Sequence, residues 1–198
     1  AAAFSGRSPE EVTLMAVTKT VEPVFINHAI ENGINLIGEN KVQEIMDKYD
    51  RVKPVRWHLI GHLQTNKVKY IIDKVCMIHS VDSLKLAKEI DKRAAQHNLV
   101  MDILVQVNSA EEESKFGITT AETDQLISDI AEQCPNIRIK GLMCIAPFED
   151  NPEDVREYFA EVKKIYDKYV DTKTERLDFE YLSMGMTHDF EVAIEEGS

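Results

Sequence analysis

The sequence predicts an α/β fold of the (β/α)8 TIM-barrel type, with the predicted strands one short of eight. Seven short apolar runs each precede an amphipathic stretch, and no hairpin signal joins one run to the next. Such alternation implies parallel strands linked by right-handed crossovers. An open, doubly wound sheet satisfies the same pattern, but seven evenly spaced units favour the barrel.

The predicted units follow one another from the first apolar run to the end of the chain. Each strand is given with its helix: 14–18 with 24–30, 36–38 with 41–49, 57–60 with 66–72, 77–80 with 83–97, 101–107 with 119–133, 141–145 with 151–170, and 181–183 with 187–196. In the fourth helix Leu86, Ile90 and Ala94 repeat every four residues, which is typical of one buried face. Thr119 and Glu122 stand in capping-box register before the fifth helix.

Composition describes an acidic globular protein without a membrane span. The 198 residues are 43% hydrophobic and carry a formal net charge of -12, which argues against a nucleic-acid partner. No apolar stretch approaches the ~20 residues that a membrane span needs. Cys76, Cys134 and Cys144 share no close spacing, so we expect buried thiols in a reducing cytoplasm. We expect one domain over 1–198, with 1–12 as a tail or incomplete first helix.

Lys19 is the most informative residue. It directly follows the first apolar run, which we expect to be a buried strand, and α/β sheets place their chemistry at the carboxyl ends of strands. A desolvated lysine amine there would be a nucleophile toward a carbonyl. Taken alone, such a lysine more often extends its amine to solvent.

The loop after the last predicted strand suggests an anion site. Ser183 and Gly185 directly precede the last predicted helix, whose free N–H groups would suit a phosphate. Plain helix capping explains the same pattern. His58 and His62 are four apart but lie in a strand and loop, so we expect no metal site and a hydrogen-bonded structural role for His58.

Several motifs together resemble a known family. They are Val17-Thr18-Lys19-Thr20, Gly38-Glu39-Asn40-Lys41-Val42-Gln43-Glu44, the segment from Trp57 to Lys67, Glu112-Glu113-Ser114-Lys115-Phe116-Gly117, and Leu182-Ser183-Met184-Gly185-Met186-Thr187. In this order they resemble the pyridoxal phosphate homeostasis protein family. The resemblance implies a barrel like the amino-terminal domain of alanine racemase, with pyridoxal 5′-phosphate (PLP) bound as a Schiff base.

The resemblance also implies roles for individual residues. Lys19 matches the Schiff-base lysine, Ser183 the phosphate ligand, and Asn40 a residue lining the cofactor site. Apart from the resemblance, the amides around Gly185 would hold the phosphate together with Ser183 at the start of the last predicted helix. From their place in the loop after the fifth predicted strand, Asn108 and Lys115 would border the mouth of the barrel, and Lys115 can equally be a solvated loop charge. Members are regarded as carriers or regulators of PLP in vitamin B6 homeostasis without a demonstrated turnover, which makes PLP-dependent apo-enzymes the candidate protein partners.

Three functions remain open at this point. The first is a non-catalytic PLP-binding homeostasis protein, which we favour. The second is a PLP-dependent amino-acid racemase or decarboxylase, but enzymes on this barrel use a second β domain for which 198 residues leave no room. The third is a cofactor-free Schiff-base aldolase, for which no proton relay is evident. The acidic surface and the missing domain favour a monomer.

The family's barrel has a strand after the last helix, and here that helix ends next to Gly197 and Ser198. A barrel that lacks one strand has two unpaired edges. We therefore expect the natural polypeptide to continue past Ser198 with an eighth strand.

Overall fold

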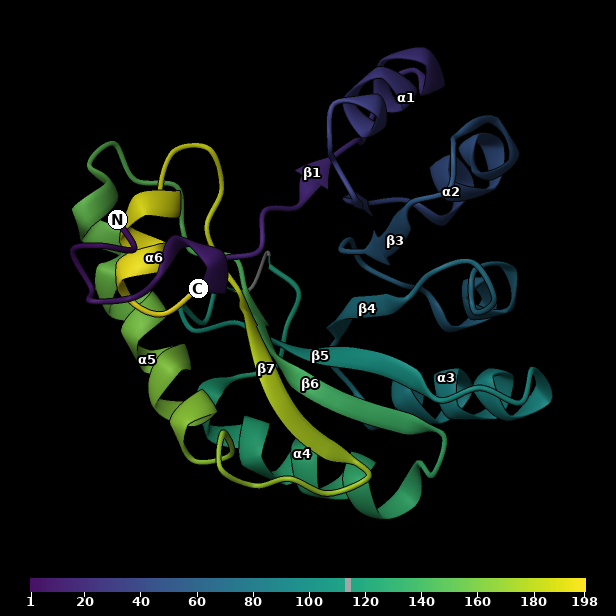
Figure 1. Cartoon of the computed structure of the whole chain (residues 1–198). Helices are drawn as coiled ribbons and strands as arrows, with labels where there is room; N and C mark the ends of the chain where they lie inside the picture. Colours follow the sequence, from purple (N-terminus) through teal and green to yellow (C-terminus); the bar gives the residue numbers. More distant parts are fainter. Residues whose placement is uncertain (113–114) are drawn as a thin grey trace.

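The computed structural model describes residues 1–112 and 115–198 and contains one seven-stranded sheet (Figure 1). Its strands lie in chain order, and every neighbouring pair is parallel. The strands are β1 (Ala16–Val17), β2 (Leu36–Glu39), β3 (Arg56–Leu59), β4 (Met77–Val81), β5 (Met101–Val107), β6 (Ile137–Cys144) and β7 (Leu177–Ser183). This order and direction are those of the predicted α/β fold of the TIM-barrel type.

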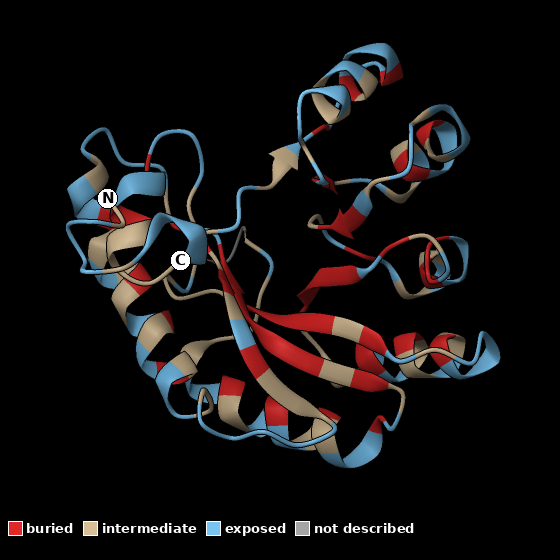
Figure 2. Cartoon of the chain, viewed as in Figure 1, coloured by how far each residue is buried: buried red, intermediate tan, exposed pale blue. Residues whose placement is uncertain are grey.

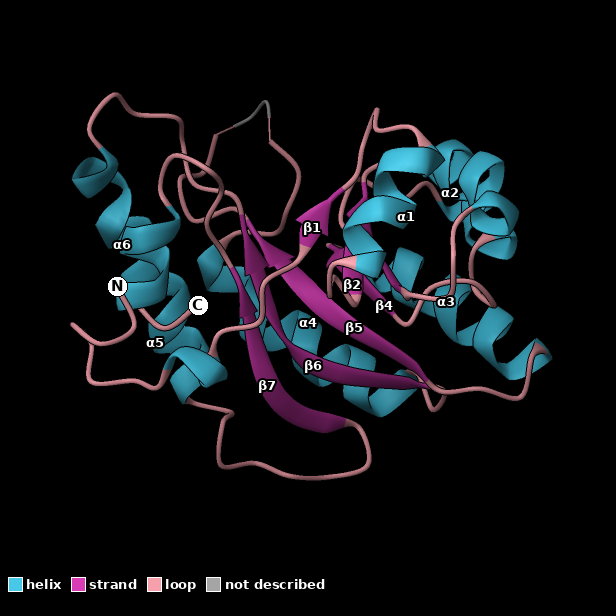
Figure 3. Ribbon diagram, turned by 45° about the horizontal axis from the view of Figure 1, so that its top comes forward, coloured by secondary structure: helices cyan, strands magenta, loops and turns pink. Residues whose placement is uncertain are grey.

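Helices connect successive strands and cover the outer face of the curved sheet (Figure 3). The α-helices are α1 (Pro23–Glu31), α2 (Val42–Lys48), α3 (Leu84–Gln96), α4 (Thr120–Gln133), α5 (Arg156–Asp167) and α6 (Phe190–Glu195). Short 3-10 helices are η1 (Pro9–Glu11), η2 (Tyr49–Arg51), η3 (Thr65–Tyr70) and η4 (Pro152–Val155). None of the helices in the described residues is both long and apolar enough to cross a membrane.

The main core lies between the sheet and its helices. The residues of β5 and β6 are mostly buried (Figure 2), and Ile103 of β5 packs in the same cluster as Ile90 of α3 and Phe159 of α5. A second, smaller cluster on the other face of the strands contains Met77 and Leu104. Because side chains alternate along a strand, these two clusters define the outer and inner faces of the sheet.

Most predicted elements are confirmed, and two strands, β6 and β7, begin four residues earlier than predicted. β5 has the predicted bounds, and Ser83 caps α3 by accepting a hydrogen bond from the Leu86 N–H at 3.3 Å. β6 begins at Ile137, whereas the predicted strand begins at 141. The prediction missed the first four residues because apolar and charged side chains alternate there. The charged ones point to the inner face, where Arg138 pairs with Asp102 at 2.8 Å.

The same inner face also holds Lys140 in β6, which binds Asp178 at 2.6 Å and Glu180 at 2.5 Å in β7. β7 accordingly begins at Leu177, ahead of the predicted 181. The predicted helix over 66–72 is instead the 3-10 helix η3. Charged residues inside the sheet therefore hid the beginnings of two strands from an analysis based on apolar runs.

The prediction that the first strand is buried is wrong. β1 has only two residues, and Leu14 and Val17 are 77% and 46% exposed. β1 pairs with β2 alone, so within the described residues one of its sides meets no strand.

The amino-terminal segment lies beside the last helix (Figure 1). Arg7 Nη1 donates to the carbonyls of Ile194 at 3.0 Å and Ser198 at 2.8 Å. η1 is the one helical turn among residues 1–12, where we expected a tail or incomplete helix.

The three cysteines are free thiols. Cys134 and Cys144 are buried, as predicted, and burial is the main cause that raises the pKa of Cys134 to about 11. Cys76 is exposed, so the prediction is wrong there, because it precedes β4 in a surface turn.

Candidate functional site

The candidate residues lie at the carboxyl ends of their strands, on one side of the sheet. All strand pairs are parallel, so the ends of β1, β2, β3 and β7 face the same side. Ser183 is the last residue of β7, Asn40 directly follows β2, and Lys19 lies two residues after β1. The order of the strands thus brings distant parts of the sequence to one end of the fold.

A buried group of charges surrounds the backbone next to Lys19. We call Thr18, Glu39, Glu44 and Lys48 the ion-pair cluster. Lys48 Nζ contacts Glu39 Oε1 at 2.7 Å, Glu44 Oε2 at 2.8 Å and the carbonyl oxygen of Thr18 at 2.9 Å. The Thr18 hydroxyl donates to Glu39 Oε1 at 2.8 Å. One ammonium therefore ties α2 and β2 to the end of β1.

The ion-pair cluster holds the backbone on both sides of Lys19. Thr18 is bonded as described, and the Thr20 N–H donates to Glu44 Oε2 at 2.7 Å. Thr20 has a φ of 63°, a left-handed conformation that is rare for a β-branched residue. A strained residue fixed by its neighbours is a mark of functional sites.

Hydrogen bonds within the ion-pair cluster shift the pKa values of Lys48 and Glu44 so that both side chains stay charged. Burial acts to lower the pKa of Lys48, but its hydrogen bonds to Glu39 and Glu44 outweigh burial, and the pKa is raised. The Lys48 hydrogen bond, followed by the Thr20 amide, lowers the pKa of Glu44. Both partners are thus ionised at neutral pH.

Lys19 itself is exposed, so the expectation of a desolvated amine is wrong. Within the described residues β1 is two residues long and pairs with β2, and the turn that follows it lies at the surface. Within residues 1–112 and 115–198, no hydrogen bond or ion pair involves its ammonium. Lys19 therefore presents a free amine on a backbone that the ion-pair cluster holds in place.

A chain of hydrogen bonds lies behind Ser183. His58 Nδ1 is 2.9 Å from His79 Nε2, and His79 Nδ1 is 2.9 Å from Ser183 Oγ. Both histidines are buried, while Ser183 is half-buried. We call these three residues the histidine chain; it links β3, β4 and β7, and it includes the hydrogen bond that was predicted for His58.

The histidine chain is electrically neutral at pH 7. Burial and then the charge of Arg56 lower the pKa of His58 to about 4. Burial and then His58 lower the pKa of His79 to about 3. Each ring therefore carries one N–H, and which nitrogen carries it depends on the hydrogen bonds.

The helix after Ser183 starts later than predicted. α6 begins at Phe190, and the carboxylate of Asp189 accepts the Met186 N–H at 2.5 Å. The predicted helix over 187–196 is wrong at its start, so its dipole does not act next to Ser183. Gly185 has a φ of 89° and lies against α6, where a Cβ would come within 2.7 Å of the Ala193 Cβ. Gly185 thus lets this loop turn closely over the helix.

Asn40 is half-buried next to the loop that follows β3. A Cβ on Gly61 would stand 2.2 Å from the Asn40 carbonyl oxygen, so only glycine fits at position 61. Ile60 also donates its N–H to the Glu39 carbonyl at 2.9 Å. Gly61, in the Trp57 to Lys67 motif, therefore allows the Asn40 backbone to pack closely against this loop.

Aromatic stacking joins loops at this end. His62, after β3, stacks on Phe116, after β5, with ring centroids 3.9 Å apart and planes within 11°. Phe148 and His188 stack in the same way between the loops after β6 and β7, at 5.2 Å.

Two further predicted residues lie in the loop after β5. The Asn108 amide donates to the Glu112 carbonyl at 2.9 Å, and Lys115 pairs with Glu112 at 3.0 Å. Both therefore bind their own loop. Glu113 and Ser114, which belong to the quoted motif, lie outside the described residues.

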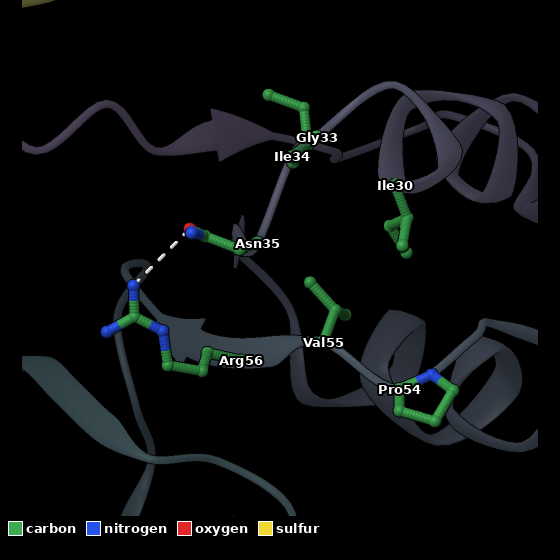
Figure 4. A pocket seen from close by; sticks show the side chains of 7 residues that line it. All are labelled: Ile30, Gly33, Ile34, Asn35, Pro54, Val55 and Arg56. Carbon is green, nitrogen blue, oxygen red and sulfur yellow. Dashed lines mark hydrogen bonds between the residues drawn. The ribbon is translucent and has the colours of Figure 1, made fainter.

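A cavity of about 610 Å³ lies at the opposite end of the sheet. Ile30, Asn35 and Val55 line it, and Arg56 closes one side with a hydrogen bond to Asn35 (Figure 4). The residues that line it lie at the amino-terminal ends of β2 and β3, whereas the candidate site lies at the carboxyl ends of the strands. In the described part of the chain, no group of three or more histidine, cysteine or acidic side chains could hold a metal ion.

Three residues of the site escaped the sequence analysis: Glu39, Lys48 and His79. Strand alternation offered a signal for His79, because Met77 and His79 must share one face and Ile78 the other. Lys48 gave no such signal, since a lysine near the end of a surface helix is ordinarily solvated.

Comparison with known proteins identifies the family and the fold. Residues 2–196 match the family model described as "Alanine racemase, N-terminal domain". The chain is 44% identical over 196 residues to the pyridoxal phosphate homeostasis protein of Aquifex aeolicus, covering 98% of this chain and 85% of that protein. It therefore belongs to the alanine racemase N-terminal-domain family and, within it, to the pyridoxal phosphate homeostasis proteins.

Solved structures show the same fold. PipY of Synechococcus elongatus PCC7942, with PLP bound, has a TM-score of 0.81 and 30% identity, over 100% of this chain and 92% of that one. Alanine racemase of Clostridium difficile 630 has a TM-score of 0.72 and 13% identity, over 91% and 48% of the two chains. The second likeness concerns the fold alone.

Proposed function

We propose that this protein binds PLP through Lys19 and serves intracellular PLP homeostasis without a turnover of its own. The observation that carries the proposal is the free amine of Lys19 on a backbone held by the ion-pair cluster, at the same end of the sheet as Ser183. The name of the Aquifex aeolicus relative and the PLP in PipY support it.

The residues present fit the two ends of this cofactor. When bound, PLP supplies an aldehyde that condenses with an amine and a phosphate that needs hydrogen-bond donors. Lys19 Nζ would form the bond to the aldehyde carbon, with release of one water. The Ser183 hydroxyl and the Gly185 N–H would donate to the phosphate, and Asn40 would line the site between them.

The absence of turnover is part of the proposal. An acid–base catalyst must reach the reacting atoms in a suitable protonation state. In the described residues, Glu39 and Lys48 serve the ion-pair cluster, His58 and His79 belong to the histidine chain, and the Asp189 carboxylate accepts the Met186 N–H. Burial raises the pKa of the Cys144 thiol, which contacts Ser109 Oγ at 3.3 Å, and Lys19 has no titratable partner. We also propose that the protein acts as a monomer in the cytoplasm, which its net charge of -12 and free thiols support. PLP-dependent apo-enzymes are the proposed recipients.

Absorbance titration with PLP tests the binding proposal. The wild-type protein and the Lys41→Ala control should both develop visible Schiff-base absorbance, whereas Lys19→Ala should develop none. Equal absorbance in Lys19→Ala would overturn the assignment. Incubation with L- and D-amino acids should give no racemisation or decarboxylation above free PLP, and turnover near the ~10 s⁻¹ of ordinary enzymes would favour the racemase alternative.

A further inference from the structure

The histidine chain admits two arrangements of its protons. In the first, the His58 Nδ1–H donates to His79 Nε2 and the His79 Nδ1–H donates to Ser183 Oγ. In the second, the Ser183 O–H donates to His79 Nδ1 and the His79 Nε2–H donates to His58 Nδ1. Any other placement of one proton per ring leaves two N–H groups or two bare nitrogens facing each other across 2.9 Å.

Only the first arrangement leaves the Ser183 hydroxyl free to donate to a ligand. In the second, its proton is used by His79, and the oxygen offers only lone pairs. A phosphate dianion accepts hydrogen bonds and donates none, so lone pairs directed at it repel it. The position of a proton on a buried histidine therefore decides whether Ser183 attracts or repels an anion.

Burial restricts the histidine chain to these two proton arrangements. His58 and His79 are 8% and 5% exposed, so water does not readily replace a missing partner on either ring. Both rings are also neutral at pH 7, because burial lowers both pKa values. The rings lie 5.0 Å apart between centroids, with planes at 55°, and the 2.9 Å between His58 Nδ1 and His79 Nε2 places these two nitrogens face to face.

We infer that His58 and His79 are positioning residues for the cofactor phosphate: with phosphate at Ser183, both rings are held as Nδ1–H tautomers and the Ser183 hydroxyl points outward. This inference rests on the proposed function, and it adds two residues that never touch the ligand. His79 orients Ser183, and His58 keeps the His79 proton on Nδ1.

Nitrogen-15 NMR of the histidine rings reads the tautomers directly. Spectra are recorded at pH 8 for the free protein, with saturating PLP, and with pyridoxal, which lacks the phosphate. His58→Asn and His79→Phe assign the signals, and exposed His28→Asn is the control. With PLP bound, both rings should carry the proton on Nδ1; the same pattern in the free protein would mean that the arrangement is preset, which supports the inference. A proton on Nε2 of His79 with PLP bound would overturn it.

Affinity measurements supply a second test. His79→Phe should weaken PLP about 10-fold, the scale of a hydrogen bond to a charged group, and change pyridoxal binding less than about 2-fold. His58→Asn, whose amide can still donate to His79, should keep PLP affinity within about 2-fold. Equal losses for PLP and pyridoxal in His79→Phe would contradict the inference. Failure of the wild type to bind PLP would refute the proposed function instead, so the two failures are distinct.

Discussion

The ion-pair cluster beside Lys19 and the histidine chain behind Ser183 are both buried polar networks at one end of the sheet, yet they differ in charge. In the first, Lys48 is ionised and donates to three acceptors at once. In the second, both histidines are neutral and each hydrogen bond can run in either direction. An ammonium can only donate, so the first network has one arrangement, whereas a neutral imidazole leaves the second with two.

This difference suits the two halves of the site. A network with one arrangement can hold the Thr18–Thr20 backbone rigidly, so that Lys19 presents its amine in one place. A network with two arrangements can let a bound phosphate select the direction of the Ser183 hydroxyl. Removing a charge from the first should therefore damage folding, and changes in the second should affect phosphate binding or acid stability.

The largest effect is expected for Lys48→Met. The change leaves Glu39, which is 0% exposed, without its counter-ion and should cost roughly 3–5 kcal/mol of unfolding free energy. Urea denaturation measures this loss. Lys53→Ala, which removes an exposed pair with Glu31, is the control and should change the unfolding free energy far less, because exposed ion pairs contribute little. A loss in Lys48→Met as small as in the control would show that the ion-pair cluster does not stabilise the fold.

The second-largest effect is expected from acid, which should lower the unfolding free energy of the protein through His58 and His79. Each folded-state pKa lies below the unfolded value of about 6.5, so the unfolded chain takes up protons first as the pH falls. Stability is complete above about pH 6.5 and declines toward pH 4, with a loss of about 2 kcal/mol per histidine by pH 5. Denaturation at a series of pH values checks this, and His58→Asn should lose less between pH 7 and pH 5 than the wild type. An identical slope in that variant would remove His58 from the explanation.

Ser183→Ala should affect binding rather than folding. Loss of a hydrogen bond to a charged phosphate should cost roughly 1.5–3 kcal/mol, or about 10- to 150-fold in PLP affinity. Pyridoxal affinity should change little, since that ligand has no phosphate. Equal weakening of both ligands would place the phosphate elsewhere.

The smallest effect is expected at Thr20. Its φ of 63° is unfavourable for threonine and suits glycine, and Thr20→Gly keeps the N–H that Glu44 accepts. The change should raise the unfolding free energy by roughly 0.5–1 kcal/mol. Asn98→Gly, at a φ of 53°, should gain less because asparagine tolerates this conformation. Destabilisation by Thr20→Gly would mean that the threonine side chain makes a contribution that backbone strain does not outweigh.

The sequence predicted the fold well because apolar runs and helix faces report burial on the outer face of the sheet. It predicted β5 to the residue and missed the start of β6, where Arg138 and Lys140 alternate with isoleucines and point to a charged inner face. It also expected a buried first strand, since Leu14 and Val17 are apolar and only three-dimensional pairing reveals an exposed edge.

For the site, the sequence proposed Lys19, Asn40, Ser183 and Gly185, and the structure brings their strand ends to one side of the sheet. It missed the supporting residues because partners such as Lys48 and Glu39 come together only through the packing of α2 on β2. Ser183 and His79 are 104 residues apart, and no local pattern records that distance.

The central claim is that Lys19 carries the cofactor, and mass spectrometry after borohydride tests it most directly. The protein is incubated with PLP, reduced, digested and mapped. We expect a phosphopyridoxyl group on the peptide that contains Lys19, at one group per chain. The same mass on Lys41, Lys67 or Lys115, with Lys19 unmodified, would contradict the account.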